Sequence, residues 1–238
     1  MKTKLTLLSI VTALMFVTSC SISGVTGNKN VIKQNRTMKE NFTSVKVSEG
    51  INLFLSQANK TSVTVEADEN IQNLLKTEVK NGVLKIYFSD AVRKATRNVY
   101  VSMPEITKIA ASSAADVKTE TLISSKNLTL DASSGADMEV KIEAENLTCE
   151  ASSGADIDLT GTCKTANIHA SSGADIDAKE LNSDTVIANS SSGADISVSV
   201  NKDITANASS GADITYYGNP EKTDINTSSG GDIDKKNK

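Results

Sequence analysis

The chain has 238 residues, with 25 Lys and Arg against 29 Asp and Glu, so its formal net charge is −4. Acidic and basic residues are interspersed without a basic cluster, which argues against a nucleic-acid partner. The sequence also lacks a phosphate-cradling glycine loop and a cluster of zinc ligands, so no cofactor or metal is expected.

Residues 1–19 have the order of a secretory signal peptide: a basic head at Lys2 and Lys4, an apolar run over residues 5–17, and small residues before Cys20. The run is too short to cross a bilayer, which needs about 20 residues. The segment Val17–Cys20 resembles a bacterial lipobox, which implies lipidation of Cys20 and a membrane anchor. Ordinary signal cleavage that leaves Cys20 as a free thiol is the alternative.

The rest of the chain divides by composition. Residues 20–37 are rich in Ser, Gly, Asn and Lys without apolar periodicity, which predicts a flexible tether. Residues 38–111 are strand-like, residues 112–233 contain a repeat, and residues 234–238 form a charged tail. We expect residues 38–111 to cap a repeat array, because the terminal units of a solenoid must protect its open end.

A pentapeptide recurs about every 19 residues. SSGAD begins at Ser133, Ser152, Ser171, Ser191 and Ser209, and the variants SSAAD and SSGGD begin at Ser112 and Ser228. Periods of this size mark a solenoid, because one unit cannot bury its own apolar face. The fold class that we predict is therefore all-β, a parallel β-helix whose coils are marked by SSGAD turns.

Between the pentapeptides, apolar and polar residues alternate with the period of a strand. The predicted inward residues before each turn are Leu128, Leu130, Ala132, Leu147, Cys149, Ala151, Ala166, Ile168, Ala170, Val186, Ala188, Ser190, Ile204, Ala206 and Ala208. Those after each turn are Met138, Ile157, Ile176, Ile196, Ile214 and Ile233. Each coil thus supplies two short strands, and its turn glycine is expected to have a positive φ. Ala114 replaces that glycine in the first coil, which predicts a different turn there.

The region before the repeat carries weaker signals. Val45, Val63 and Leu84 lie in short β runs, the pair Asn81–Gly82 predicts a hairpin turn, and residues 68–76 could form one helical turn.

Stacked coils align the serines and aspartates of the pentapeptides. The candidate ligand face comprises Ser133, Asp137, Ser152, Asp156, Ser171, Asp175, Ser191, Asp195, Ser209 and Asp213. Three interpretations of these aspartates remain open. Each aspartate could accept hydrogen bonds at its own turn, the carboxylates could bind calcium, or the serine and aspartate array could bind a regular polymer such as a glycan.

Catalysis has little support in the sequence. His169 is the only histidine, at an outward position with Glu150 and Asn189 as its stacked neighbours. A serine nucleophile needs a base that a third group orients, and repetition argues for a scaffold. Cys149 points into the core and Cys163 lies at a turn, which favours two free thiols over a disulfide.

Several motifs together resemble the putative auto-transporter adhesin, head GIN domain family of Bacteroidetes envelopes. They are Gly50–Asn52 within a β run, the Asn81–Gly82 turn, the SSGAD series and the segment Tyr217–Pro220. The resemblance covers about residues 42–232. It implies a right-handed β-helix and an envelope location, and no catalytic residues come with it.

These observations predict a non-enzymatic envelope lipoprotein that presents its serine and aspartate face to a glycan or protein partner. A structural spacer without a specific ligand is the alternative. Surface lipoproteins of those bacteria resemble one another in having acidic residues after the lipidated cysteine. Residues 21–24 contain none, so the periplasmic leaflet of the outer membrane is expected.

Overall fold

The computed structural model describes residues 23–237. The predicted signal peptide and Cys20 lie outside the described residues. Within residues 23–237, all regular elements are strands except one 3-10 turn, η2 (Glu69–Ile71), which confirms the predicted helical turn. No helix within residues 23–237 is long and apolar enough to span a membrane.

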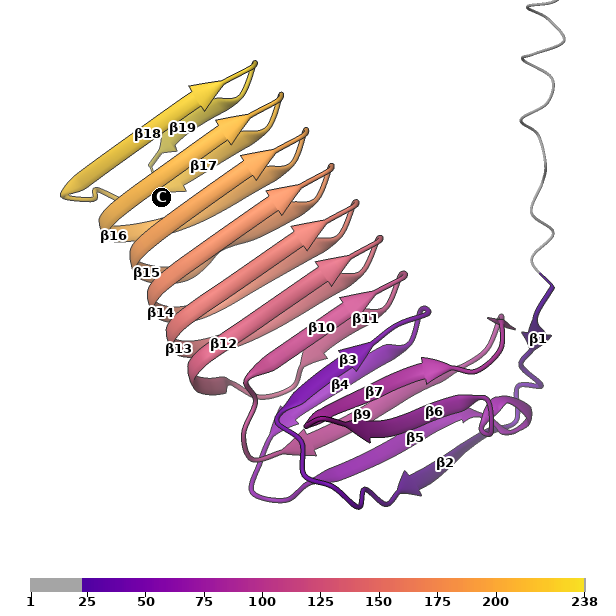
Figure 1. The fold of residues 1–238 in the computed structure, drawn as a ribbon. Coiled ribbons are helices and arrows are strands. Elements are labelled where there is room, and N and C mark those ends of the chain that lie inside the picture. The colour runs from indigo at the N-terminus through magenta and orange to yellow at the C-terminus, as the bar shows by residue number, and fades with distance from the viewer. Residues whose placement is uncertain (1–22, 238) are drawn as a thin grey trace, which may run out of the picture.

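The repeat region is a β-solenoid, seen in Figure 1 as a regular stack of parallel strands. Its strands are β10 (Lys108–Ser112), β11 (Asp116–Thr119), β12 (Ile123–Ser133), β13 (Asp137–Ser152), β14 (Asp156–Ser171), β15 (Asp175–Ser191), β16 (Asp195–Ser209), β17 (Asp213–Tyr217), β18 (Lys222–Ser228) and β19 (Asp232–Lys236). Equivalent residues of successive coils pair in parallel, with Asp137 opposite Asp156 and Ser152 opposite Ser171. The predicted fold class is confirmed.

Each long strand bends once. In β13 the alternation of buried and exposed residues breaks at Glu145 and Asn146, which are both exposed. The strand therefore contains a first leg that begins at the aspartate and a second leg that ends at the serine. We call the two sheets formed by these legs the first-leg sheet and the second-leg sheet.

The core lies between the two sheets. All the predicted inward residues of the complete coils are buried, and Ile233 of the last coil is partly buried. Cys149 and Cys163 are free and buried. Cys163 was expected at a turn, and it lies close to the bend of β14 with its side chain directed inward. Burial raises the pKa of the Cys149 thiol, which keeps this sulfur protonated.

The SSGAD turn uses two consecutive left-handed residues. Ser134 and Gly135 have φ of 56° and 67°. The positive φ of the turn glycines is confirmed, whereas the conformation of the second serine was not predicted. Ala114 has φ 57°, so the first coil turns like the others and the expected difference is wrong.

One further coil precedes the SSGAD series. β3 (Ser44–Val47) pairs in parallel with β10, and β4 (Asn52–Gln57) pairs in parallel with β11. The connecting residues Glu49 and Gly50 both have φ 65°. The segment Ser48–Asn52 is thus a diverged form of the pentapeptide turn, with glycine at the same place and asparagine in place of aspartate.

The N-terminal end of the solenoid is closed by additional strands. These are β1 (Val25–Thr26), β2 (Val31–Arg36), β5 (Ser62–Asp68), β6 (Leu75–Lys80), β7 (Val83–Phe88), β8 (Val92–Arg93) and β9 (Arg97–Met103). The first-leg sheet continues through β4, β9, β5 and β2, and the second-leg sheet through β3, β7 and β6. The hairpin predicted at Asn81–Gly82 joins β6 and β7.

Strands extend into both the predicted tether and the charged tail. Residues 20–37 were expected to be a tether, but Val25–Thr26 pairs with β8, and Val31–Arg36 pairs antiparallel with β5. In the expected tail, β19 continues to Lys236, opposite Tyr217. The hydrogen bonds of neighbouring strands order both segments where composition alone predicted none.

Candidate functional site

The structure divides the predicted ligand face between the two sheets. Ser133, Ser152, Ser171, Ser191 and Ser209 align at the end of the second-leg sheet. Asp137, Asp156, Asp175, Asp195 and Asp213 align at the start of the first-leg sheet. The left-handed turn separates the two sets and reverses the chain, so the serines and the aspartates belong to different sheets.

The aligned aspartates form an exposed row that we call the acidic column: Asp116, Asp137, Asp156, Asp175, Asp195, Asp213 and Asp232. Adjacent members stand about 4.8 Å apart, the spacing of paired strands. Partial burial and then the charge of Asp116 raise the pKa of Asp137. Partial burial and then the charges of Asp195 and Asp156 raise the pKa of Asp175. Partial burial and neighbouring like charges therefore disfavour the ionised forms of Asp137 and Asp175.

One interpretation of the sequence is that each aspartate accepts hydrogen bonds at its own turn. Within residues 23–237, the structure does not show such bonds for most of the acidic column. Within residues 23–237, the carboxylate of Asp232 accepts a hydrogen bond from the following amide of Ile233 at 2.9 Å. No other carboxylate of the acidic column accepts one from a serine hydroxyl or backbone amide of its own turn in this part of the chain. Solvent or a partner is left to satisfy these oxygens.

A second row of outward side chains lies two residues farther along each first leg. This mixed column comprises Tyr100, Phe54, Lys118, Glu139, Asp158 and Asp177. Lys118 forms an ion pair with Glu139 at 2.7 Å. Partial burial and then the charge of Asp177 raise the pKa of Asp158.

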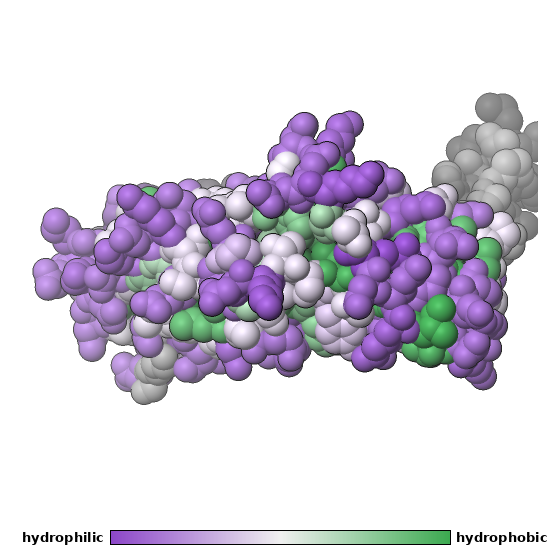
Figure 2. Space-filling model, turned by 90° about the horizontal axis from the view of Figure 1, so that it is seen from below, coloured by the Kyte–Doolittle hydropathy of each residue, from purple (hydrophilic) through white to green (hydrophobic). Residues whose placement is uncertain are grey.

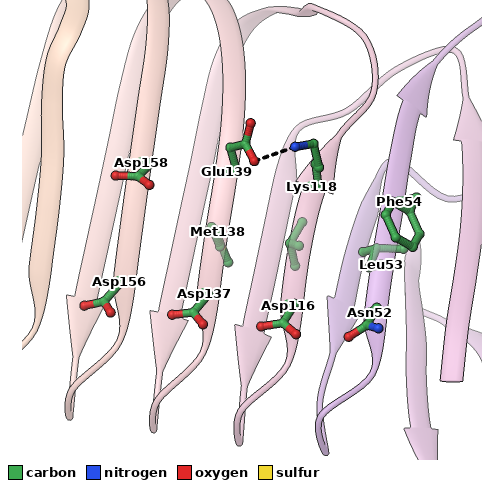
Figure 3. A pocket seen from close by; sticks show the side chains of 11 residues that line it. Asn52, Leu53, Phe54, Asp116, Lys118, Asp137, Met138, Glu139, Asp156 and Asp158 are labelled. Carbon is green, nitrogen blue, oxygen red and sulfur yellow. Dashed lines mark hydrogen bonds and ion pairs between the residues drawn. The ribbon is translucent and has the colours of Figure 1, made fainter. Parts of the chain in front are cut away.

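A shallow groove of about 500 Å³ runs between the acidic and mixed columns. Figure 3 shows Asn52, Asp116, Asp137 and Asp156 along one side, with Phe54 at one end. The buried residues Leu53, Val117 and Met138 contribute to its floor. The view in Figure 2 shows a mainly hydrophilic surface with small apolar areas between polar side chains.

The mixed column begins with two stacked aromatic rings that the sequence analysis did not single out. The ring centroids of Phe54 and Tyr100 are 5.0 Å apart, with 16° between the ring planes. The hydroxyl of Tyr100 donates to Glu66 at 2.9 Å, and Nζ of Lys33 lies 5.4 Å from the Tyr100 centroid. The hydrogen bond to this carboxylate raises the pKa of Tyr100. The alternation in β4 and β9 is the signal that could have placed both rings outward.

Among residues 23–237, no three His, Cys, Asp or Glu side chains converge as metal ligands would. His169 is exposed and lies between Glu150 and Asn189, the predicted neighbours.

A family model described as "Putative auto-transporter adhesin, head GIN domain" matches residues 41–220. The chain belongs to this family. In this head GIN domain, the Gly50–Asn52 motif is the turn into β4, and it places Asn52 next to Asp116 in the acidic column. No curated protein matches the chain.

Solved structures share the fold of this head GIN domain. A crystal structure of a "putative adhesin" from Bacteroides fragilis is 22% identical, with a TM-score of 0.83, and covers 90% of this chain and 100% of its own. A "putative lipid binding protein" from Parabacteroides distasonis is 19% identical, with a TM-score of 0.75 and the same coverage. A "putative adhesin" from Parabacteroides merdae is 17% identical, with a TM-score of 0.71 and the same coverage.

Proposed function

We propose that this protein is a non-enzymatic adhesion module of the cell envelope. Lipidation at Cys20 anchors it to the outer membrane, on the periplasmic leaflet, and the first-leg sheet contacts a glycan or an envelope protein. The adhesin family supports the general class. The acidic column and the adjoining groove support the choice of surface.

The observation that carries the proposal is the acidic column, in which, within residues 23–237, only Asp232 accepts a hydrogen bond from its own turn. Neighbouring carboxylates about 4.8 Å apart repel by about 0.9 kcal/mol even at the dielectric constant of water. Serine or asparagine at these positions would avoid that repulsion, and a structural spacer has no use for it. Locally unfavourable residues that a fold retains are typical of functional surfaces.

Thermal melting of residues 21–238 against a panel of glycans and solubilised envelope fractions tests this function. We expect a bound partner to raise the melting temperature. The double change Asp156→Asn and Asp175→Asn should reduce that rise, because it removes two adjacent acceptors of the acidic column. The matched change Ser152→Ala and Ser171→Ala on the second-leg sheet should leave it intact.

The other outcomes are equally informative. A panel in which nothing shifts the melting temperature supports the spacer and contradicts the adhesion module. A shift with calcium alone, absent from the aspartate variant, supports the metal interpretation. Loss of binding in the serine variant and not in the aspartate variant moves the contact surface to the second-leg sheet.

A further inference from the structure

We propose that the groove beside Phe54 is a subsite for an uncharged sugar ring, which stacks on the phenyl group and donates hydroxyl hydrogen bonds to the acidic column. This inference rests on the proposed adhesion function and names its ligand as a neutral glycan. It places the specificity of the surface at the end nearest the N-terminal cap, where the two aromatic rings lie.

Phe54 is positioned as a platform at one end of the groove. Its ring is half-buried on the outer face of β4 and lies in the groove lining. On the next coil, Lys118 directs its ammonium group toward Glu139 and away from Phe54, as Figure 3 shows. The ammonium group therefore does not cover the phenyl ring from the groove side.

The platform is fixed from behind. Tyr100 stacks on Phe54, and its hydroxyl is bonded to Glu66, which also pairs with Lys33 at 3.2 Å. Offset-stacked aromatic pairs of this kind favour a defined relative orientation. A ligand that stacks on Phe54 therefore meets a ring whose position is already set, which lowers the entropic cost of binding.

Hydrogen-bonding groups stand across the groove from Phe54. The side-chain nitrogen of Asn52 donates to Asn98 at 2.9 Å, which fixes the amide and leaves its oxygen as an acceptor. Asp116 and Asp137 follow on the next two coils and also line the groove. Ionised carboxylates are pure acceptors. Sugar hydroxyl groups are donors, and the C–H faces of the ring suit an aromatic platform.

The charge and the sheet position of the groove argue against two other classes of occupant, anionic polymers and an added peptide strand. Its lining has five carboxylates, Asp116, Asp137, Glu139, Asp156 and Asp158, against the single ammonium of Lys118. Anionic polymers are therefore repelled. β4 pairs with β9 on one side and β11 on the other, so no backbone edge is free for an added peptide strand.

Equilibrium binding of residues 21–238 to soluble uncharged polysaccharides tests the subsite. The panel is dextran, mannan, laminarin and xylan, with heparin and polylysine as charged probes. We expect at least one uncharged polysaccharide to bind and heparin not to bind. Phe54→Ala and Phe54→Leu should each weaken binding at least tenfold, because both remove the aromatic face, whereas Phe54→Tyr should retain it.

Tyr87→Ala is the matched control, since Tyr87 is a half-buried aromatic residue on β7 of the second-leg sheet. It should bind like the unchanged protein, and circular dichroism confirms that every variant is folded. Binding that survives Phe54→Ala and fails in the Asp156→Asn and Asp175→Asn variant overturns the subsite and leaves the adhesion function standing. Binding of polylysine in place of all uncharged polysaccharides overturns the sugar as ligand. Absence of binding to every polysaccharide overturns the subsite, and the adhesion function falls with it only if the envelope fractions also leave the melting temperature unchanged.

Discussion

The first SSGAD-type turn contains an alanine in a conformation that favours glycine. Ala114 has φ 57°, close to the 67° of Gly135 in the next coil. For an L-residue, the left-handed conformation costs roughly 1–2 kcal/mol. This local cost is tolerated because the turn amide of Ala114 donates to Ser134 of the next coil at 3.1 Å.

We therefore expect Ala114→Gly to stabilise the protein by about 1 kcal/mol, which corresponds to a rise of roughly 2–4 °C in melting temperature. The reverse change Gly154→Ala should lower stability by a similar amount. A β-carbon at Gly154 meets no atom within 4 Å, so backbone strain alone acts there. Thermal unfolding followed by circular dichroism measures both. A destabilised Ala114→Gly variant would contradict the strain argument.

The raised pKa values in the acidic column predict a pH-dependent stability. A carboxyl whose pKa is higher in the folded state than in the unfolded chain destabilises the fold above its folded pKa. This effect disappears as the pH falls below the unfolded value, which is 3.8 for Asp175. Asp175→Asn should therefore raise the melting temperature by about 2 °C at pH 7.

The advantage of Asp175→Asn should shrink as the pH falls through the folded pKa and vanish below the unfolded value. Melting curves of both proteins between pH 3 and pH 8 measure it. Asn207→Ala, on the outer face of the second-leg sheet, is a control that should show no such trend. An advantage that grows on acidification would show that the carboxylate is stabilised in the fold.

At the residue scale, the sequence predicted inward and outward side chains well, because alternation with period two leaves no ambiguity once the register is set. It did not predict the left-handed second serine, because serine has no marked preference for that conformation. The sequence analysis also placed Ser133 and Asp137 on one face of the solenoid. Two residues that are four positions apart can lie on one face of a sheet or on the two sides of a turn. Only the turn geometry decides between these arrangements.

The coil is the structural unit at the scale of elements. Asp156 and Asp175 occupy equivalent positions 19 residues apart, and the intervening chain completes one circuit. Each coil contacts mainly its neighbours, so stability in such arrays is approximately a sum over units and their interfaces.

Deletion of residues 156–174 should remove one whole coil and join Ala155 to Asp175 in register. We expect a folded monomer with a cooperative melt at a lower temperature. Deletion of residues 156–175 removes one residue more and places Ile176 at an outward position, which reverses the alternation of the following leg. That variant should aggregate or lose β structure, as size-exclusion chromatography and circular dichroism will show. Equal behaviour of the two deletions would contradict the coil as unit.

The elements that the sequence analysis missed have diverged from the repeat. The segment Ser48–Asn52 retains the glycine and the turn but not the SSGAD letters, so self-comparison of the sequence did not find it. The segment of β2 lacks apolar periodicity, so the sequence predicts a tether there. In the structure its residues are almost entirely exposed. An edge strand that lies beyond the core has no apolar alternation to reveal it.

The aromatic pair of the proposed subsite illustrates the same limit. Phe54 and Tyr100 are 46 positions apart in sequence, and the parallel pairing of β4 with β9 brings them together. Nothing local predicts that pairing. The repeated aspartates, in contrast, could be aligned from the sequence because each coil carries its own marker.

At the scale of the whole molecule, the anchor is the feature to test first. We expect Cys20→Ala to move the protein from the membrane fraction to the soluble fraction of the envelope, because the proposed lipid is lost. Cell fractionation with mass spectrometry of the N-terminal peptide measures this. Cys163→Ala, in the buried core, is the control and should leave the protein on the membrane. Membrane retention of Cys20→Ala would contradict the lipid anchor.

The early start of β1 limits how far such an anchored module can extend from the bilayer. Four residues lie between Cys20 and Val25, so the five Cα–Cα steps that join these two residues span at most about 18 Å. The acidic column and its continuation through Asn52 and Asn98 include nine coil positions, which extend about 38 Å along the stack. With the lipid anchor proposed at Cys20, the segment before β1 allows about 18 Å between the lipid and β1, and the stack itself supplies about 38 Å along the acidic column. In such an anchored protein, the reach of the acidic column is therefore set more by the rigid length of the stack than by the anchoring segment.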